Sequence, residues 1–447
     1  MIGGLMRFQC VERICAACLL IALLQGCTTP GQSGAQPAAK VDADPDAAVR
    51  DFQIRALDAA VQTMSPGVER DYFAGMLASR SGRTNDSIRL LNGVIPAIRS
   101  SQPERAAHAL EALGDSYTIA YRYRDAAQAY DDLEAHFAQN LPPDVADDAA
   151  LARILVDAPA QTLEWEGPVR QKTSRNPIGL LETDISVNGV EVSWLLDTGA
   201  NQSVVTRSVA ERLGLTPLPG TAATGSGITG IKSPLRAAIL PTLRIGGAVL
   251  HNVVVIILDD ANLRVGSPSE AYQIQAILGY PVLKALGRIR FAHEGEFLAG
   301  EIAAEQTGGA PMFMRGLTPA IESLVDNERL LFTFDTGATS TDFSVRYYEL
   351  FRGRASTWRT RTIQTGGAGG TVTRQMFIQP TVDLKVGDAV VSLTNVPIFS
   401  SRMNSGIDLL FGNLGQDFVD GFSSFTLDFP KMTFSMGAPL KPHSETR

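Results

Sequence analysis

The chain has 447 residues, of which 45% are hydrophobic and 19% charged, and its formal net charge is −8. This length and balance predict a globular protein of two or three domains that can bury a core. Because the charge is acidic and no basic stripe is present, we expect no nucleic-acid partner.

Residues 1–26 are typical of an export signal, because two arginines precede an apolar run at residues 14–24 that is too short for a stable membrane span. The run ends in the letters LQGC at residues 24–27, which resemble the lipobox of bacterial lipoproteins. That resemblance implies that Cys27 is lipidated and anchors the exported chain in a membrane. Thr28 after it favours the outer membrane, facing the periplasm. The alternative is a plain cleaved signal with an incidental cysteine.

All four cysteines lie at or before Cys27, so the rest of the chain has no thiol for a disulfide, a nucleophile or a thiolate metal site. The five histidines are scattered without the spacing of metal ligands. No Gly-x-Ser-x-Gly elbow of a serine hydrolase is present. We therefore expect neither a metal nor a cofactor.

Residues 27–48 are rich in Pro, Gly and Ala and predict a flexible tether. Residues 49–160 have helical spacing of Ala, Leu, Arg, Glu and Gln. Within them the pattern LxxLGxxY at residues 110–117, followed by Ala126 and Tyr130, resembles a tetratricopeptide helix pair.

A weaker copy of this pattern begins at Tyr72, and its Gly75 lies 39 residues before Gly114. The resemblance implies a concave surface that holds a protein partner or a substrate tail. The alternative is a generic helical bundle that only packs against the next domain. In either case the region contains no acid–base cluster, so we expect a fragment that starts near Gln161 still to cleave an unstructured peptide.

Beyond Gln161, short runs rich in Val, Ile, Leu, Thr and Phe alternate with Gly clusters, which predicts an all-β region. The fold class is therefore α+β and multidomain, with an all-α region followed by two β lobes at residues 165–305 and 306–440.

The β region contains an internal duplication. The letters LLDTGA at residues 195–200 return as TFDTGA at residues 333–338, 138 positions later, and a Gly-rich segment follows each. Three further landmarks recur in the same order: Leu243-Arg244-Ile245-Gly246 with Leu384-Lys385-Val386-Gly387, Asn252-Val253 with Asn395-Val396, and Ile277-Leu278-Gly279 with Leu410-Phe411-Gly412. The two lobes are thus predicted to be homologous.

From about Arg175 to Ala438 these motifs resemble the pepsin/retropepsin superfamily of aspartic peptidases, in the single-chain form with two lobes. The resemblance implies an endopeptidase in which Asp197 and Asp335 are the catalytic pair and the substrate is a peptide or protein. Two carboxyl groups close enough to share one proton can activate a water molecule and protonate the departing amine.

The residues around each aspartate suit this geometry. Gly199 and Gly337 allow tight loops whose N–H groups point at the carboxylates, and by resemblance Thr198 and Thr336 bond across the lobe interface. Gly279 and Gly412 are the expected braces under the loops, with Gly415 as an alternative in the second lobe. Gly225, Gly227, Gly367 and Gly369 mark candidate flaps over the substrate, or else ordinary surface turns.

One chain carries both aspartates, and only 56 positions separate Gly279 from Asp335. That spacing leaves little slack for exchanging lobes, so we expect a monomer with one site. The presence of both aspartates, threonines and glycines favours an active peptidase. The alternatives are an inactive envelope adaptor that binds peptides or proteins through its helices, and a processing enzyme directed to one client.

Overall fold

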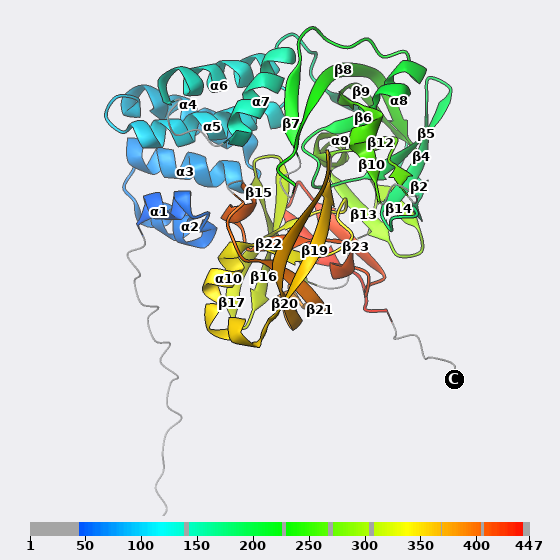
Figure 1. Ribbon diagram of the computed structural model, residues 1–447. Helices are drawn as coiled ribbons and strands as arrows, with labels where there is room; N and C mark the ends of the chain where they lie inside the picture. The colour runs from blue at the N-terminus through cyan, green and yellow to red at the C-terminus, as the bar shows by residue number, and fades with distance from the viewer. Residues whose placement is uncertain are drawn as a thin grey trace, which may run out of the picture. The chain divides into compact units, whose positions relative to one another are not determined.

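The computed structural model describes residues 44–137, 143–225, 229–266, 271–303, 308–367, 369–403 and 406–440. These residues form one compact unit in which helices come first and strands follow (Figure 1). The expected signal, most of the tether and Cys27 lie outside the described residues. Across the described ranges, no helix is both long and apolar enough to cross a membrane.

The helical region consists of α1 Pro45–Arg50, α2 Ile54–Thr63, α3 Val68–Arg80, α4 Thr84–Ile98, α5 Pro103–Ile119, α6 Tyr123–Phe137 and α7 Pro143–Ile154. Two helix pairs in it repeat the same close contact. A Cβ atom on Gly75 of α3 would lie 2.5 Å from the Leu91 side chain of α4, and one on Gly114 of α5 would lie 2.4 Å from the Tyr130 ring of α6. Gly114 lies 39 positions after Gly75, and Tyr130 lies 39 positions after Leu91. The two helix pairs therefore pack through equivalent residues.

Lobe 1 contains β1 Thr162–Trp165, β2 Val169–Lys172, β3 Ser174–Arg175, β4 Leu181–Val187, β5 Val190–Leu196, β6 Ser203–Thr206, α8 Arg207–Arg212, β7 Ala222–Gly225, β8 Lys232–Ile245, β9 Ala248–Leu258, β10 Arg264–Val265, β11 Tyr272–Gln273, β12 Ala276–Leu278, α9 Tyr280–Ala285, β13 Arg288–Ala292 and β14 Glu296–Ala299.

Lobe 2 contains β15 Ala310–Arg315, β16 Thr318–Val325, β17 Glu328–Phe334, β18 Asp342–Phe343, α10 Val345–Leu350, β19 Arg359–Gly367, β20 Gly370–Val386, β21 Ala389–Phe399, β22 Gly412–Leu414, β23 Ser424–Asp428 and β24 Thr433–Met436. The strand order β5-β12-β6-β9 of lobe 1 recurs as β17-β22-β18-β21 in lobe 2. The duplication seen in the sequence is therefore a duplication of topology.

Local turn chemistry also repeats between the lobes. Asn188-Gly189 joins β4 to β5, and Asp326-Asn327 joins β16 to β17, with positive φ at all four residues. A two-residue turn with positive φ at both positions has a backbone twist that matches the flanking strands. Both hairpins lead into the strand that ends at an aspartate.

The lobes are not separate sheets, because their pairing continues across the boundary near residue 305. The order β15-β24-β23-β13-β14-β2 takes three strands from each lobe, and β13 pairs with β23 so that Ile289 lies opposite Leu427. Both of these side chains are fully buried. This shared sheet ties the lobes to each other.

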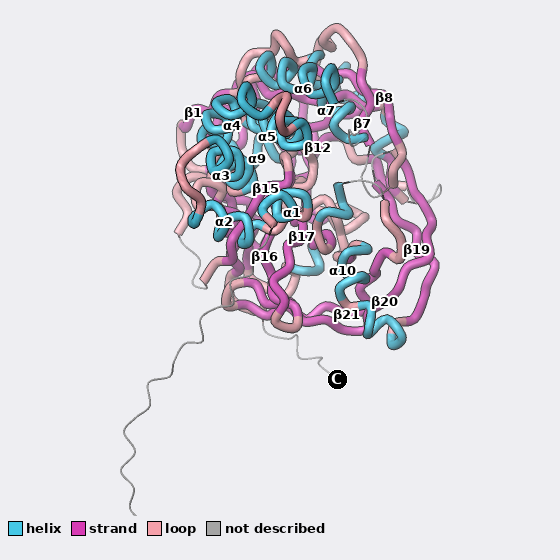
Figure 2. Tube along the Cα trace, turned by 90° about the vertical axis from the view of Figure 1, so that its left-hand side faces the viewer, coloured by secondary structure: helices cyan, strands magenta, loops and turns pink. Residues whose placement is uncertain are grey.

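The helical region packs against both lobes, and Figure 2 shows it along one side of the strands. Helix α3 contacts β15 of lobe 2, and Arg55 of α2 makes two hydrogen bonds of 2.6 Å to the buried carboxylate of Glu322 in β16. On lobe 1, the Tyr121 hydroxyl donates to the Pro281 carbonyl at 2.9 Å. The helices therefore share a core with the lobes. The change from helical spacing to strand-like runs near residue 160 does not predict this.

Candidate active site

Each aspartate stands directly after a buried strand. Asp197 follows β5 and Asp335 follows β17. The Asp197 N–H donates to the Leu278 carbonyl of β12 at 3.0 Å, and the Asp335 N–H donates to the Leu414 carbonyl of β22 at 3.0 Å. A parallel strand thus holds the start of each loop by the same bond.

The two threonines join the loops across the lobe interface. The Thr198 hydroxyl donates to the Phe334 carbonyl at 2.8 Å and accepts the Thr336 N–H at 3.1 Å. Reciprocally, the Thr336 hydroxyl donates to the Leu196 carbonyl at 2.6 Å and accepts the Thr198 N–H at 3.0 Å. Both threonines are fully buried, so water does not compete for these four bonds.

The glycine of each loop lies against the carboxyl group of the other loop. A Cβ atom on Gly199 would lie 2.5 Å from Cγ of Asp335, and one on Gly337 would lie 2.4 Å from Oδ2 of Asp197. The Gly199 and Ala200 N–H groups donate to Oδ1 of Asp197 at 2.8 and 2.9 Å, and the Gly337 N–H donates to Oδ1 of Asp335 at 2.7 Å. Any larger residue at these glycines would separate the carboxyl groups.

The carboxyl groups of Asp197 and Asp335 are joined by a hydrogen bond. Both keep partial solvent access, yet burial raises the pKa of each above the usual range of an aspartate. The charge of Asp335 adds to the rise for Asp197, whereas the bond from Asp197 opposes the rise for Asp335. The two carboxyl groups therefore share one proton, and the pair titrates as a unit.

The brace under each loop is a glycine, but in lobe 2 it is Gly415 and not Gly412. Gly279 follows Leu278, and Gly415 follows Leu414, the two residues whose carbonyls hold the aspartates. A Cβ atom would lie 2.4 Å from the Gln202 carbonyl at Gly279 and 2.6 Å from the Ser340 backbone at Gly415. A Cβ atom on Gly412 would lie elsewhere, 2.3 Å from the Asp342 carbonyl of β18.

Sequence reasoning missed three polar residues of the site. Ser203 and Thr341 occupy equivalent positions, and their hydroxyls accept the N–H groups of Gly279 and Gly415, each at 3.1 Å. Asn413 donates from Nδ2 to Oδ2 of Asp335 at 3.4 Å. The 138-residue offset of the internal repeat links Ser203 to Thr341, so the sequence could have identified that pair. The lobe-1 counterpart of Asn413 is the apolar Ile277, so the repeat gives no indication that Asn413 belongs to the site.

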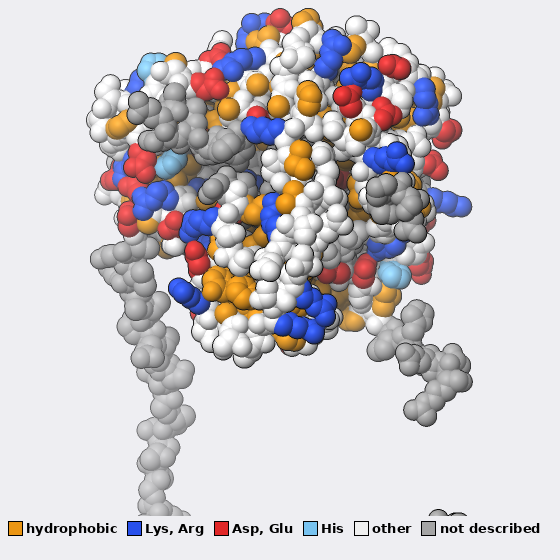
Figure 3. Space-filling view, in the orientation of Figure 1, with side chains coloured by type: hydrophobic (Ala, Val, Ile, Leu, Met, Phe, Trp, Pro, Cys, Tyr) orange, Lys and Arg blue, Asp and Glu red, His pale blue; other side chains and the backbone are white. Residues whose placement is uncertain are grey.

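The Gly-rich segments lie on two hairpins that touch each other. Gly225 ends β7 opposite Lys232, and Gly367 ends β19 opposite Gly370. At the second tip, a Cβ atom on Gly369 would lie 3.0 Å from the Ser233 hydroxyl of β8. In Figure 3 this β19–β20 hairpin presents mostly neutral polar surface. Gly227 lies outside the described residues.

Helix α7 packs against the first of these hairpins. Asp147 of α7 forms a 2.8 Å ion pair with Lys232 of β8, and Ile154 at the end of α7 lies 3.2 Å from where a Cβ atom on Gly220 would be. The hairpin of lobe 1 is thus supported by the helical region on one side and touched by the lobe 2 hairpin on the other.

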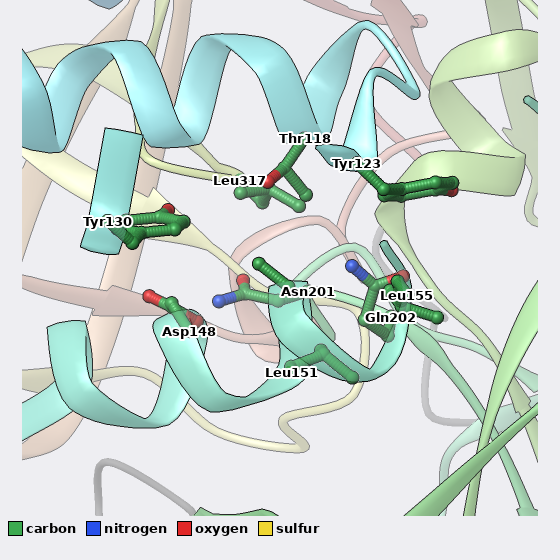
Figure 4. Close-up of a pocket in the computed structure, with 10 residues that line it drawn as sticks. Thr118, Tyr123, Tyr130, Asp148, Leu151, Leu155, Asn201, Gln202 and Leu317 are labelled. Atoms are coloured by element: carbon green, nitrogen blue, oxygen red, sulfur yellow. The ribbon is translucent and has the colours of Figure 1, made fainter. Parts of the chain in front are cut away.

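A cavity of about 30 Å³ lies where the helical region meets the Asp197 loop (Figure 4). It is lined by Tyr130 and Asp148 on the helices, by Asn201 and Gln202 after the loop, and by Leu317 of lobe 2. This volume holds about two water molecules, far less than a peptide. The cavity does not include the aspartate pair, so we assign it to the junction and not to the site.

In the parts of the chain that the structure describes, no three His, Cys, Asp or Glu side chains gather as a metal site requires. The described side chains that meet at the two loops are carboxyl, hydroxyl and amide groups. Their arrangement suits proton transfer between paired carboxyl groups.

Part of lobe 1 matches the model of a known protein family. Residues 183–282 match the family model described as Aspartyl protease. The match covers the Asp197 loop and its Gly279 brace, and it supports an aspartic-protease-like lobe 1. No curated protein matches the chain.

Similar solved structures include the basic 7S globulin of soybean, with 11% identity over 61% of this chain and 95% of that chain and a TM-score of 0.40. Another is conglutin gamma, a basic 7S globulin of lupine seeds, with 13% identity over 62% and 95% of the two chains and a TM-score of 0.41.

Proposed function

We propose that this chain is an aspartic endopeptidase that hydrolyses peptide bonds with a water molecule activated between Asp197 and Asp335. The observation that carries the proposal is the contact between the two aspartate loops. Each half of the chain supplies one carboxyl group, a hydrogen bond joins the two groups, and four buried threonine bonds hold their loops together.

In the proposed reaction the ionised carboxylate takes a proton from water, and the water oxygen attacks the carbonyl carbon of the substrate. The protonated carboxyl group of the pair donates a hydrogen bond to the carbonyl oxygen. When the C–N bond breaks, the amine nitrogen receives a proton from the pair, which restores the shared-proton state. No covalent intermediate and no metal enters these steps.

The experiment is cleavage of an unstructured protein by the purified full chain between pH 3 and pH 8. Asp197→Asn and Asp335→Asn are each expected to lower the rate by about 10²-fold to 10⁴-fold, because either change removes the shared proton. Asp383→Asn in lobe 2 is the matched control, since this carboxylate is exposed. A statine-type transition-state mimic should inhibit and a chelator should not.

Equal activity in wild type and both active-site variants, with all of them folded, would contradict the proposal. An inactive wild type that binds peptides as well as both variants do would favour the envelope adaptor.

We further propose one site per monomer, built from the two lobes of a single chain. Inactive Asp197→Asn and Asp335→Asn chains, refolded together at equal amounts, should then remain inactive. Recovery of about a quarter of wild-type activity would indicate sites formed between chains.

For localisation we propose export and lipid anchoring through Cys27 in the outer membrane, facing the periplasm, on the basis of the sequence at residues 24–27. A fatty-acid label should mark the wild type and not Cys27→Ala, and labelling of both would contradict lipidation.

For the helical region we propose tetratricopeptide-like pairs that select or hold a protein substrate or partner. The repeated contacts of Gly75 and Gly114 support this proposal. The peptide selectivity of the full chain should change when exposed residues of the helices are substituted. Unchanged selectivity across such a set would favour a purely structural bundle.

A further inference from the structure

Beside each aspartate loop, three side chains lie in register on neighbouring strands. The lobe-1 row consists of Leu195, Ile277 and Val204, and the lobe-2 row consists of Thr333, Asn413 and Asp342. The internal repeat relates the rows, because Leu195 and Val204 each lie 138 positions before their lobe-2 counterparts. The two rows are the same place in the two lobes.

Both rows lie on the face opposite the main core of their lobe, but in lobe 1 Leu195 and Ile277 are themselves buried in a second apolar cluster. The next residues along the strands, Leu196 and Leu278 in lobe 1 and Phe334 and Leu414 in lobe 2, are fully buried in that core. Successive side chains of a strand point to opposite faces. In lobe 2 the opposite face is the one that meets the aspartate pair, since Asn413 donates to Oδ2 of Asp335.

The rows differ in chemistry. The lobe-1 row is entirely apolar, whereas the lobe-2 row carries a hydroxyl, an amide and a carboxyl group. The Thr333 hydroxyl donates to Oδ1 of Asn413 at 2.6 Å, which turns the Nδ2 group of that amide toward Asp335. The lobe-2 row is therefore polar where its lobe-1 counterpart is part of a buried apolar cluster.

Asp342 is the exceptional member of the lobe-2 row. Its side chain is only 9% exposed, and its pKa is raised to about 7 by burial and by the charges of Asp335 and Asp417. None of the described side chains forms an ion pair with it, although buried carboxylates are normally paired. A carboxyl group in this position is complementary to a cation supplied by a ligand.

We infer that the lobe-2 row is a subsite for a basic side chain of the substrate. This inference rests on the proposed function and names its substrate class: peptides in which lysine or arginine stands beside the cleaved bond. The side of the bond on which the basic residue stands is read from the cleavage products.

The test compares matched peptides that carry lysine, norleucine or glutamate at the position beside the cleaved bond. Wild type is expected to prefer lysine over norleucine in kcat/KM, and Asp342→Asn is expected to reduce that preference about tenfold or more. The readout is the ratio of kcat/KM for the lysine and norleucine peptides within each protein, so a change of the basal rate in the variant does not enter it. Asp383→Asn, which changes an exposed carboxylate of lobe 2, is the matched control and should keep the wild-type ratio.

Thermal unfolding of each variant checks its folding, and Asp342→Ser replaces Asp342→Asn if the latter is unfolded. An active Asp342→Asn with the wild-type preference would overturn the inference and leave the proposed function intact. A wild type that prefers glutamate or norleucine beside the bond would also overturn it.

A binding measurement separates the subsite from catalysis. A non-hydrolysable peptide isostere with lysine should bind wild type about tenfold more tightly than its norleucine analogue, and Asp342→Asn should remove the difference. If wild type hydrolyses nothing but shows this binding pattern, the subsite stands and the proposed hydrolysis fails. Equal affinity for both isosteres would contradict the subsite.

Discussion

At the scale of single residues, Thr198 and Thr336 decide whether the two aspartates meet. Each hydroxyl both donates and accepts across the lobe interface without access to water. Serine keeps such a hydroxyl, whereas valine has the same shape as threonine and lacks it. The pair therefore allows a substitution test that separates hydrogen bonding from packing.

We predict that Thr198→Val lowers the free energy of unfolding by about 2–4 kcal/mol, because it leaves the Phe334 carbonyl and the Thr336 N–H unpaired in a buried interface. Thr198→Ser should cost about 1 kcal/mol or less through its lost methyl group. Urea unfolding followed by circular dichroism measures both. A valine variant as stable as the serine variant would show that these bonds contribute nothing.

Asp342 predicts a pH dependence of stability. Burial, with the charges of Asp335 and Asp417, raises its folded-state pKa to about 7, above the value of about 3.9 in an unfolded chain. The folded protein therefore binds more protons than the unfolded one between these values, so this group destabilises the fold increasingly as pH rises through that window.

Asp342→Asn should accordingly gain stability over wild type as pH increases from 5 to 8, by on the order of 2 kcal/mol or more. The measurement is the difference in free energy of unfolding between the two proteins at both pH values. A difference that stays constant with pH would mean that Asp342 titrates normally.

At the scale of elements, the strands β12 and β22 perform one task with different sequences. Each runs parallel to the strand that leads to an aspartate, and each is followed by a glycine packed on the backbone of the loop. The motif similarity pointed to Gly412 in lobe 2, because the letters LFG at residues 410–412 imitate ILG at residues 277–279. Strand register places Gly415 there instead.

We predict that Gly415→Ala lowers the free energy of unfolding by roughly 2 kcal/mol or more, since its Cβ atom would collide with backbone that cannot give way. Gly353→Ala is the matched control. No atom lies within 4 Å of a Cβ atom at Gly353, so that change should be neutral or slightly stabilising. Thermal unfolding of both proteins tests the assignment, and equal melting temperatures would refute it.

At the scale of the whole molecule, the helical region and the lobes depend on each other. The hydrophobic cluster of the helices includes Ala320, Leu331 and Leu410 of lobe 2, and the cluster beside the Asp197 loop includes Tyr123 and Leu155 of the helices. Arg55 also pairs with the buried Glu322. Removal of the helices would expose apolar surface and leave this carboxylate with fewer partners.

We therefore predict that a fragment starting at Gln161 is less stable than the full chain and aggregates, contrary to the expectation of an independent, active β region. Static light scattering and circular dichroism of the purified fragment measure this. A soluble, folded fragment that cleaves peptides at the wild-type rate would show that the shared clusters are dispensable.

Much of the architecture could be predicted from the sequence because it depends on local chemistry and on internal repetition. Asn252 and Asn395, noted only as repeated letters, both adopt positive φ, a backbone state that asparagine tolerates. Gly246 and Gly387 do the same at the ends of two equivalent hairpins. Such positions can be predicted from the sequence because the backbone conformation depends on the type of the residue itself.

The tertiary structure alone decided the contacts between segments far apart in the chain. In the folded chain, Gly415 and not Gly412 lies under the second loop, and Asn413 lies beside Asp335. The lobes share one sheet, and the helices pack on both lobes. None of these follows from residue type, because a one-residue change of register moves every side chain of a strand to the other face. The sequence by itself determined the two aspartate loops and their repetition. What surrounds the loops depended on register and packing, which only the folded chain specifies.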